Sequence, residues 1–355
     1  MKRTAVFLAL LALALPTLAQ SEAVQAKSFQ EQIDVNAVLL DVIVTDSKGN
    51  QILGLGKDDF IVKEDGVAQS VESVDYYTNR ALLDQREENA PFQVERVHEN
   101  RYFVFFFDKP QDAGVLFDKI QRARQAAVDF VQNEMKDTDY VAILGHDMRM
   151  KVYSDFTNDK KQLEKALAEA IRFGNGTTKA PAGDGPSILR NMDTGKLVNH
   201  TGSVYEALDL LGDSTRAIRG RKNLVLFSPG IVDRHEMIRN GTVTNRASEF
   251  DEALHSLNAA NVAVYSVQLQ DDVSLTPAIH QRLSELSDET GGRYFRFNTS
   301  FEPAVERIEN TNSGYYLVTY SSKKPKGEKG YQKVDVKLRN PEFKIVARSG
   351  YQYGS

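Results

Sequence analysis

The sequence contains neither cysteine nor tryptophan, and it has no surplus of basic residues. Without cysteine the chain can form no disulfide, no thiolate metal site and no cysteine nucleophile. Lys and Arg total 44 against 49 Asp and Glu, which gives a formal net charge of -5. Because nucleic-acid binding depends on concentrated positive charge, we expect no nucleic-acid partner.

Long apolar runs are also missing, apart from one at the N-terminus. The stretch "MKRTAVFLALLALALPTLAQ" places Lys2 and Arg3 before an apolar run, Ala5–Leu15, and ends with a small-residue cleavage site at Ala19. This pattern predicts a secretory signal peptide over residues 1–19, because the run is too short for a transmembrane helix. We therefore expect an exported protein without a membrane span, in the periplasm or outside the cell.

Residues 101–310 alternate apolar strands with amphipathic helices. The run "YFVFFFD" is apolar up to Asp108 and predicts a buried strand. The helix that follows it carries one apolar stripe, made of Ile120, Ala123, Ala127, Phe130 and Val131. Repetition of this pattern predicts an α/β domain with a doubly wound, mostly parallel sheet. The Gly-, Asn- and Asp-rich excursion at 174–199 is expected to be a surface loop.

Both ends of the chain have a β pattern instead. Residues 28–80 and 311–355 alternate apolar and polar positions, as in Val334 and Val336 on one face with Asp335 between them. Residues 81–100 are charged and predict a linker. Three strands at either end would be marginal alone. We infer that the two ends pair into a small β-sandwich in which the α/β domain is inserted, or which flanks it.

Three stretches of the sequence are similar to one protein family. They are "VIVTDSKGNQILGLGKDDFIVKEDG" (Val42–Gly66), "LSELSDETGGRYF" (Leu283–Phe295) and "VARSGY" (Val346–Tyr351). The residues of these motifs and their order along the chain resemble the exported VWFA-related family of the acidobacterial type. The order of the predicted strands and helices resembles a von Willebrand factor A domain. The resemblance implies a non-enzymatic protein-interaction or adhesion module whose partner is a protein or a cell-surface ligand.

The resemblance also implies where a metal site would lie. Many A domains hold Mg²⁺ at a metal-ion-dependent adhesion site, built from an Asp-x-Ser-x-Ser loop, a Thr and a second Asp. Here the first Asp matches Asp108, but Pro110 and Asp112 stand at the two Ser positions. The degenerate site implied by the resemblance consists of Asp108, Asp112, Thr201, Ser203, Ser228 and Asp233.

Two interpretations of Asp108 remain open. A metal held by so few carboxylates would keep mostly water ligands and bind weakly. Alternatively, Asp108 accepts hydrogen bonds at a helix start and needs no ion, with Lys109 beside it as a substitute positive charge. The second interpretation is preferred, so we expect no cofactor. The alternative is a true Mg²⁺-dependent adhesion protein.

Catalysis is the remaining function class. His146 and Asp147 follow a predicted strand and could act as a base with its orienting acid. The sequence lacks His-Glu-x-x-His, Gly-x-Ser-x-Gly and a phosphate-binding glycine loop. We therefore predict no catalytic residues and no enzyme activity. The alternative from this class is a periplasmic hydrolase that uses His146 and Asp108.

Overall fold

The computed structural model describes most of the chain after residue 36. The residues it describes are 37–78, 94–96, 100–109, 113–231, 247–269, 277–296, 305, 308, 314–322 and 329–354. They belong to one unit, Ala37–Ser355. The predicted signal peptide at 1–19 and most of the predicted linker lie outside the described residues.

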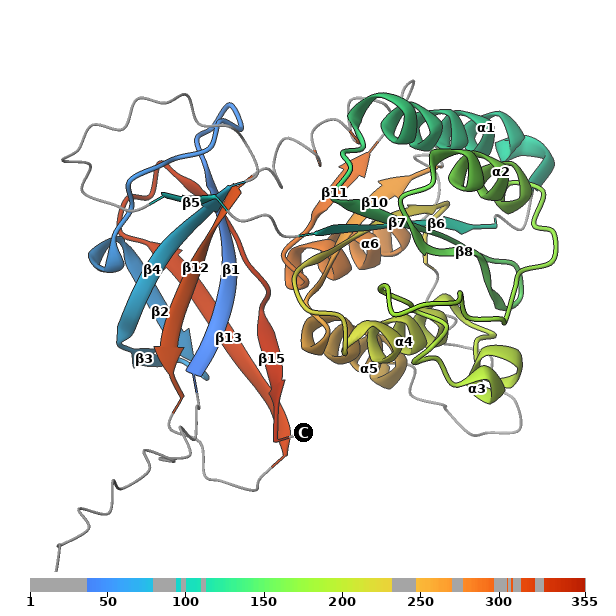
Figure 1. Cartoon of the computed structure of the whole chain (residues 1–355). Coiled ribbons are helices and arrows are strands. Elements are labelled where there is room, and N and C mark those ends of the chain that lie inside the picture. Colours follow the sequence, from blue (N-terminus) through green and yellow to red (C-terminus); the bar gives the residue numbers. More distant parts are fainter. Residues whose placement is uncertain are drawn as a thin grey trace, which may run out of the picture. The chain divides into compact units, whose positions relative to one another are not determined.

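A six-stranded sheet forms the centre of the α/β part (Figure 1). Its strand order is β11-β10-β9-β6-β7-β8. Its strands are β6 (Arg101–Asp108), β7 (Asp139–His146), β8 (Met150–Thr157), β9 (Lys222–Ser228), β10 (Val262–Gln268) and β11 (Arg293–Arg296). All are parallel except β8, which runs antiparallel to β7. Counted along the chain, this is the 3-2-1-4-5-6 order of doubly wound folds. The prediction of a mostly parallel α/β sheet is confirmed.

The central strand β6 is buried along its whole length. Parallel strands covered on both faces are apolar throughout, which explains the run of aromatic residues. Its one basic residue, Arg101, is paired: the guanidinium donates two hydrogen bonds, of 2.7 and 2.6 Å, to the carboxylate of Asp139 on β7. Such a bidentate pair compensates the cost of burying both charges.

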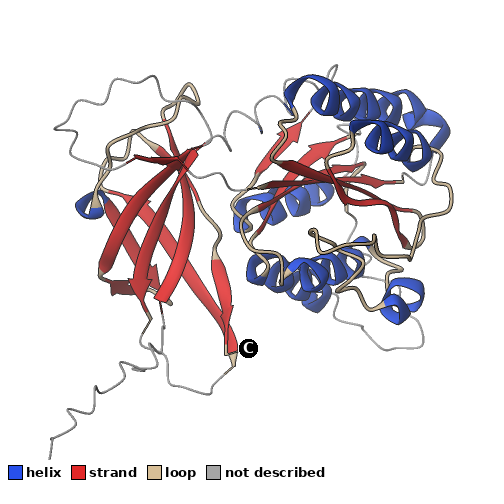
Figure 2. Ribbon diagram, in the orientation of Figure 1, coloured by secondary structure: helices blue, strands red, loops and turns tan. Residues whose placement is uncertain are grey.

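Helices cover both faces of this sheet (Figure 2). They are α1 (Ala113–Asp129), continued by a π turn (Phe130–Glu134), α2 (Lys160–Ala170), α3 (Thr194–Asn199), α4 (Val204–Thr215), α5 (Ala247–Ala259) and α6 (Pro277–Glu289). Side chains of α1 and α2 share one buried cluster with the sheet, and side chains of α4, α5 and α6 share the other. The predicted stripe of α1 and the π turn is confirmed, since all five of its residues are buried.

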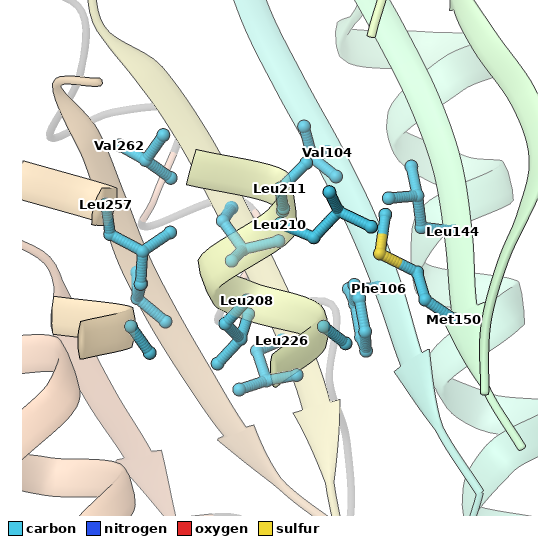
Figure 3. Packing of buried hydrophobic residues seen from close by; sticks show 14 of the residues in the cluster. Val104, Phe106, Leu144, Met150, Leu208, Leu210, Leu211, Leu226, Leu257 and Val262 are labelled. Atoms are coloured by element: carbon cyan, nitrogen blue, oxygen red, sulfur yellow. The ribbon is translucent and has the colours of Figure 1, made fainter. Parts of the chain in front are cut away.

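Close packing of leucines joins α4 to the sheet. Leu208 and Leu211 of α4, Phe106 and Leu226 of the sheet and Leu257 of α5 belong to one cluster (Figure 3). All five side chains are completely buried. Truncating such a leucine to alanine typically lowers the free energy of unfolding by about 2–5 kcal/mol. This packing therefore fixes the position of the strands whose carboxyl ends are described below.

The two ends of the chain pair with each other in two further sheets. Their strands are β1 (Ala37–Thr45), β2 (Phe60–Glu64), β3 (Val67–Gln69), β4 (Val71–Thr78), β5 (Val94–Arg96), β12 (Gly314–Ser321), β13 (Gly330–Leu338), β14 (Lys344–Val346) and β15 (Gly350–Tyr353), with a 3-10 turn at Lys57–Asp59. One sheet has the order β14-β1-β12-β4-β5 and the other β15-β13-β2-β3. Apolar side chains of both sheets form a single buried cluster. Val334 and Val336 of β13 are buried and Asp335 is exposed, as the alternation predicts.

A tight hairpin turn is formed by Asp65 and Gly66. These two residues connect β2 to β3, and both have positive φ, 46° and 82°. That geometry belongs to the two-residue turn whose twist matches antiparallel strands, and Asp-Gly is a preferred sequence for it.

Two predictions for connecting segments need correction. Within the predicted linker, Val94–Arg96 forms a short strand that pairs with β4. The excursion at 174–199 is not merely a surface loop, because Ile188 and Leu189 are buried in the core. Their backbone N–H groups donate to the buried carboxylate of Asp155 on β8, at 2.8 and 3.1 Å. The polar composition of residues 174–199 gave no indication of this buried attachment to β8.

Two of the three stretches that carry the family resemblance meet in the structure. Thr290, just after α6, forms an isolated antiparallel bridge with Arg348. Gly291 has a φ of 71°, and a Cβ added there would lie 2.8 Å from the backbone carbon of Ala347. The glycine therefore ends the helix and also allows close approach of the C-terminal strands.

Candidate functional site

The sheet order brings three polar side chains to one edge. Asp108, His146 and Ser228 are the last residues of β6, β7 and β9, which are neighbours in the sheet. Asp108 and His146 are direct partners in the register. Ligands of open α/β sheets generally bind at this edge, beyond the strand carboxyl ends. We call the strand ends and the loops after them, Asp108–Lys109, His146–Arg149, Thr201–Ser203 and Ser228, the strand-carboxyl rim.

Both carboxylate oxygens of Asp108 have neighbours. The Ser228 hydroxyl donates to Oδ2 at 2.7 Å. The Nδ1 atom of His146 lies 3.5 Å from Oδ1. Asp108 and His146 are only 6% and 7% exposed, and Ser228 is fully buried. A carboxylate with so little solvent contact needs such partners to offset its desolvation.

The contacts continue from His146 to Thr201. The second ring nitrogen of His146, Nε2, lies 3.1 Å from the Thr201 carbonyl oxygen, so it donates a hydrogen bond there. The Thr201 hydroxyl accepts from the backbone N–H of Met150 at 3.0 Å and donates to the carbonyl of Leu197 at 2.8 Å. We call Asp108, His146, Thr201 and Ser228 the Asp108 cluster.

Ser203 has a different partner set. It is the N-cap residue of α4, and its hydroxyl accepts from the backbone N–H of Glu206 at 3.1 Å. The Glu206 carboxylate in turn accepts from the Ser203 backbone N–H, which completes a capping box. The Ser203 hydroxyl also donates to the carboxylate of Glu249 on α5 at 3.1 Å.

The described members of the predicted metal site do not by themselves fit Mg²⁺. This ion needs near-octahedral coordination by oxygen. Asp108 offers the one carboxylate, and both its oxygens already have protein neighbours. Within the described part of the chain, no group of three or more His, Cys, Asp or Glu side chains could hold a metal ion. Asp112 and Asp233 lie outside the described residues.

Lys109 does not face Asp108 through its ammonium group. Its Nζ atom lies 3.0 Å from the carboxylate of Asp147 and 5.4 Å from the ring centre of Phe173. Lys151 lies 3.3 Å from the other oxygen of Asp147. Partial burial acts to raise the pKa of Asp147, but the hydrogen bonds and charges of Lys109 and Lys151 outweigh it and lower that pKa. The side chain that lies beside the Asp108 carboxylate is therefore that of His146 and not that of Lys109.

The geometry separates His146 from the acid expected beside it in sequence. Asp147 pairs with the two lysines, and Asp108 faces the imidazole instead. The Ser228 hydroxyl donates to Asp108 and accepts from the N–H of Gly230 at 3.1 Å. A serine nucleophile requires its hydroxyl against a base. In these contacts the carboxylate stands between Ser228 and His146.

His146 is the contact that the metal-site pattern missed. The strand-end position of His146 was visible in the sequence, but its pairing with Asp108 depends on the β6–β7 register. Met148 was missed as well. It lies at the tip of the β7–β8 hairpin and is 82% exposed.

No protein-family model matches the sequence, and no curated protein matches it either. Solved structures show distant similarity. An aerotolerance-related membrane protein from Bacteroides fragilis NCTC 9343 is 12% identical, with a TM-score of 0.38 over 60% of this chain and 99% of that one. BatB from Bacteroides thetaiotaomicron is 11% identical, with a TM-score of 0.37 over 60% and 98%. The PilB minor pilin from Streptococcus sanguinis is 12% identical, with a TM-score of 0.41 over 77% of each chain.

Similarities this distant say nothing about what the chain binds, so its class rests on its own sheet and helix order. The α/β part is a doubly wound α/β fold: a mostly parallel six-stranded sheet with helices on both faces, accompanied by antiparallel sheets from the chain ends. Among the described residues, no helix is long and apolar enough to cross a membrane.

Proposed function

We propose that this chain is an exported, non-enzymatic binding protein of the acidobacterial VWFA-related type. Its ligand is a protein or a cell-surface component, and the strand-carboxyl rim binds it without a divalent cation. The observation that carries this proposal is the set of contacts around Asp108, whose two oxygens face Ser228 and His146.

The physical reason is competition for the same oxygens. A cation bound to Asp108 would share its two oxygens with the Ser228 hydroxyl, at 2.7 Å, and with the neighbouring imidazole, at 3.5 Å. The oxygen lone pairs that the Thr201 and Ser203 hydroxyls would offer a cation already accept hydrogen bonds from the backbone N–H groups of Met150 and Glu206.

A non-catalytic role is supported by the same contacts. Nε2 of His146, the atom that would take a proton from a nucleophile, already donates to the Thr201 carbonyl. The Asp108 cluster therefore holds three rim segments, the ends of β6, β7 and β9, to the loop before α4. A rigid base beneath exposed loops favours binding, because less conformational entropy is lost on association.

The cation question is tested by titrating the EDTA-treated full-length chain with Mg²⁺ and Mn²⁺. Calorimetry gives binding directly, and thermal unfolding gives it independently, since a ligand that binds only the native state raises the melting temperature. We expect a flat titration in both. Saturable binding that is lost in Asp108→Ala would contradict cation-independent binding and favour the Mg²⁺-dependent adhesion protein.

The rim is tested by site-specific photocrosslinking. A photoreactive amino acid replaces His200, an exposed residue next to Thr201, or Val67, which is 65% exposed on β3. Each protein is incubated with extract of the source cells in EDTA or in Mg²⁺. We expect a discrete adduct from position 200 in both conditions and none from position 67. Adducts from position 67 alone would refute rim binding.

A further inference from the structure

A methionine at the rim is unfavourably placed in two respects: its apolar side chain is exposed to solvent, and its backbone has a positive φ. Met148 forms the tip of the β7–β8 hairpin and is the most exposed large apolar residue in the described part of the chain, at 82%. Its φ is +58°, in the left-handed region that is unfavourable for a side chain bearing a Cβ. Glycine would adopt this conformation without strain. Strained, exposed positions of this kind gather at binding sites.

The base of the tip is held in place. The backbone N–H of Asp147 donates to the Arg149 carbonyl at 3.0 Å, which closes the turn beneath Met148. The Asp147 carboxylate bridges Lys109 and Lys151, at 3.0 and 3.3 Å. Lys151 also donates to the carbonyl of Phe173 at 2.8 Å. Because the backbone is fixed, a partner that contacts Met148 need order only the side chain.

The charge around the tip is opposite to that of the whole chain. Lys109, Arg149 and Lys151 lie there with the carboxylate of Asp147, while the Asp108 carboxylate at the end of β6 is buried. Arg149 is exposed, and its guanidinium has no carboxylate partner among the described residues. The full chain carries a formal charge of -5. A basic spot on an acidic protein is complementary to an acidic partner surface and steers its approach.

We propose that Met148 is the apolar anchor of the rim, and that its partner is a folded protein with an apolar pocket bordered by carboxylates. This inference rests on the proposed function, because it assumes that the rim binds. A flexible, polarisable thioether suits insertion into a pocket, and Arg149 is placed to pair with a carboxylate at the pocket border. A lipid surface is the weaker fit, since one methionine buries too little apolar area to hold a protein on a membrane.

The first experiment places the photoreactive amino acid at 148, at 200 and at 67 of the full-length chain. Adducts formed in source-cell extract are identified by mass spectrometry, and the identified protein is purified. It is then titrated by calorimetry against wild type, Met148→Asp, Arg149→Glu and the control Val67→Asp, which places the same charge on an exposed apolar position away from the rim. Circular dichroism confirms that each variant is folded.

We expect position 148 to give the same adduct as position 200. Met148→Asp should weaken binding at least tenfold, and Arg149→Glu should weaken it about threefold to tenfold with a reduced salt dependence. Val67→Asp should bind like wild type. Full affinity of Met148→Asp for a partner captured at position 200 would overturn the anchor and leave rim binding intact. Adducts at position 67 alone would overturn both the Met148 anchor and rim binding. If the wild type adsorbed to anionic lipid vesicles and Met148→Asp did not, the partner would be a membrane and the proposal of a protein partner would be wrong.

Discussion

Replacing Asp108 by asparagine tests whether this carboxylate is a structural acceptor or an unfilled metal ligand. The substitution keeps the shape and one carbonyl oxygen for the Ser228 hydroxyl, but it removes the charge that faces His146. A hydrogen bond to a charged group contributes about 1.5–3 kcal/mol. Part of that bond remains in the variant, so we expect unfolding free energy to fall by about 1–3 kcal/mol.

The opposite sign is expected for a metal site without its ion. There the carboxylate would be desolvated and poorly compensated, so neutralising it would stabilise the protein or leave its stability unchanged. Urea unfolding in EDTA measures the difference in unfolding free energy between wild type and Asp108→Asn. If Asp108 is a structural acceptor, the melting temperature of Asp108→Asn should be roughly 5 °C below that of wild type.

A double-mutant cycle assigns the loss to the right contact. Ser228→Ala removes the donor of the 2.7 Å bond to Asp108. The Asp108→Asn/Ser228→Ala protein should lose less unfolding free energy than the sum of the two single losses, because Asp108→Asn weakens the bond that Ser228→Ala removes. The reasoning is refuted if Asp108→Asn is as stable as wild type in EDTA and Mg²⁺ stabilises only the wild type.

Three further predictions concern the fold and the rim. Burial lowers the pKa of Lys222 to about 7, so between pH 7 and the ordinary lysine pKa the unfolded chain binds one proton more than the folded chain. The free energy of unfolding should therefore rise by about 2–3 kcal/mol from pH 6 to pH 9. Urea unfolding measures this rise, which should be smaller in Lys222→Met. Gly292→Ala would place a Cβ 1.9 Å from the carbonyl oxygen of Val264, and it should cost about 3 kcal/mol in urea unfolding or prevent folding. Met148→Gly should raise stability by up to about 1 kcal/mol, because relief of the positive φ outweighs the entropy cost of glycine. A calorimetric melting temperature at or below that of wild type would contradict the last of these.

The sequence determined the elements, because periodicity is a local property. The α1 stripe that includes Ile120 and Ala123 is buried, and Val334 and Val336 of β13 face inward, as the patterns predict. Asp65 and Gly66 form the turn that an Asp-Gly pair favours, because their backbone preferences act within two residues. The pairing of the two chain ends could be inferred only indirectly, from the fact that neither end has enough strands alone.

The tertiary structure decided which groups meet at the rim. Asp147 and His146 are neighbours in sequence, but the register of β6 against β7 places only His146 against Asp108. Asp147 lies beyond the strand end and pairs with the two lysines. No local pattern encodes this, because contacts between strands depend on sheet order and register. The sequence by itself therefore determined the net charge and the α/β fold class. Long-range packing determined which partner each polar side chain has at the candidate site.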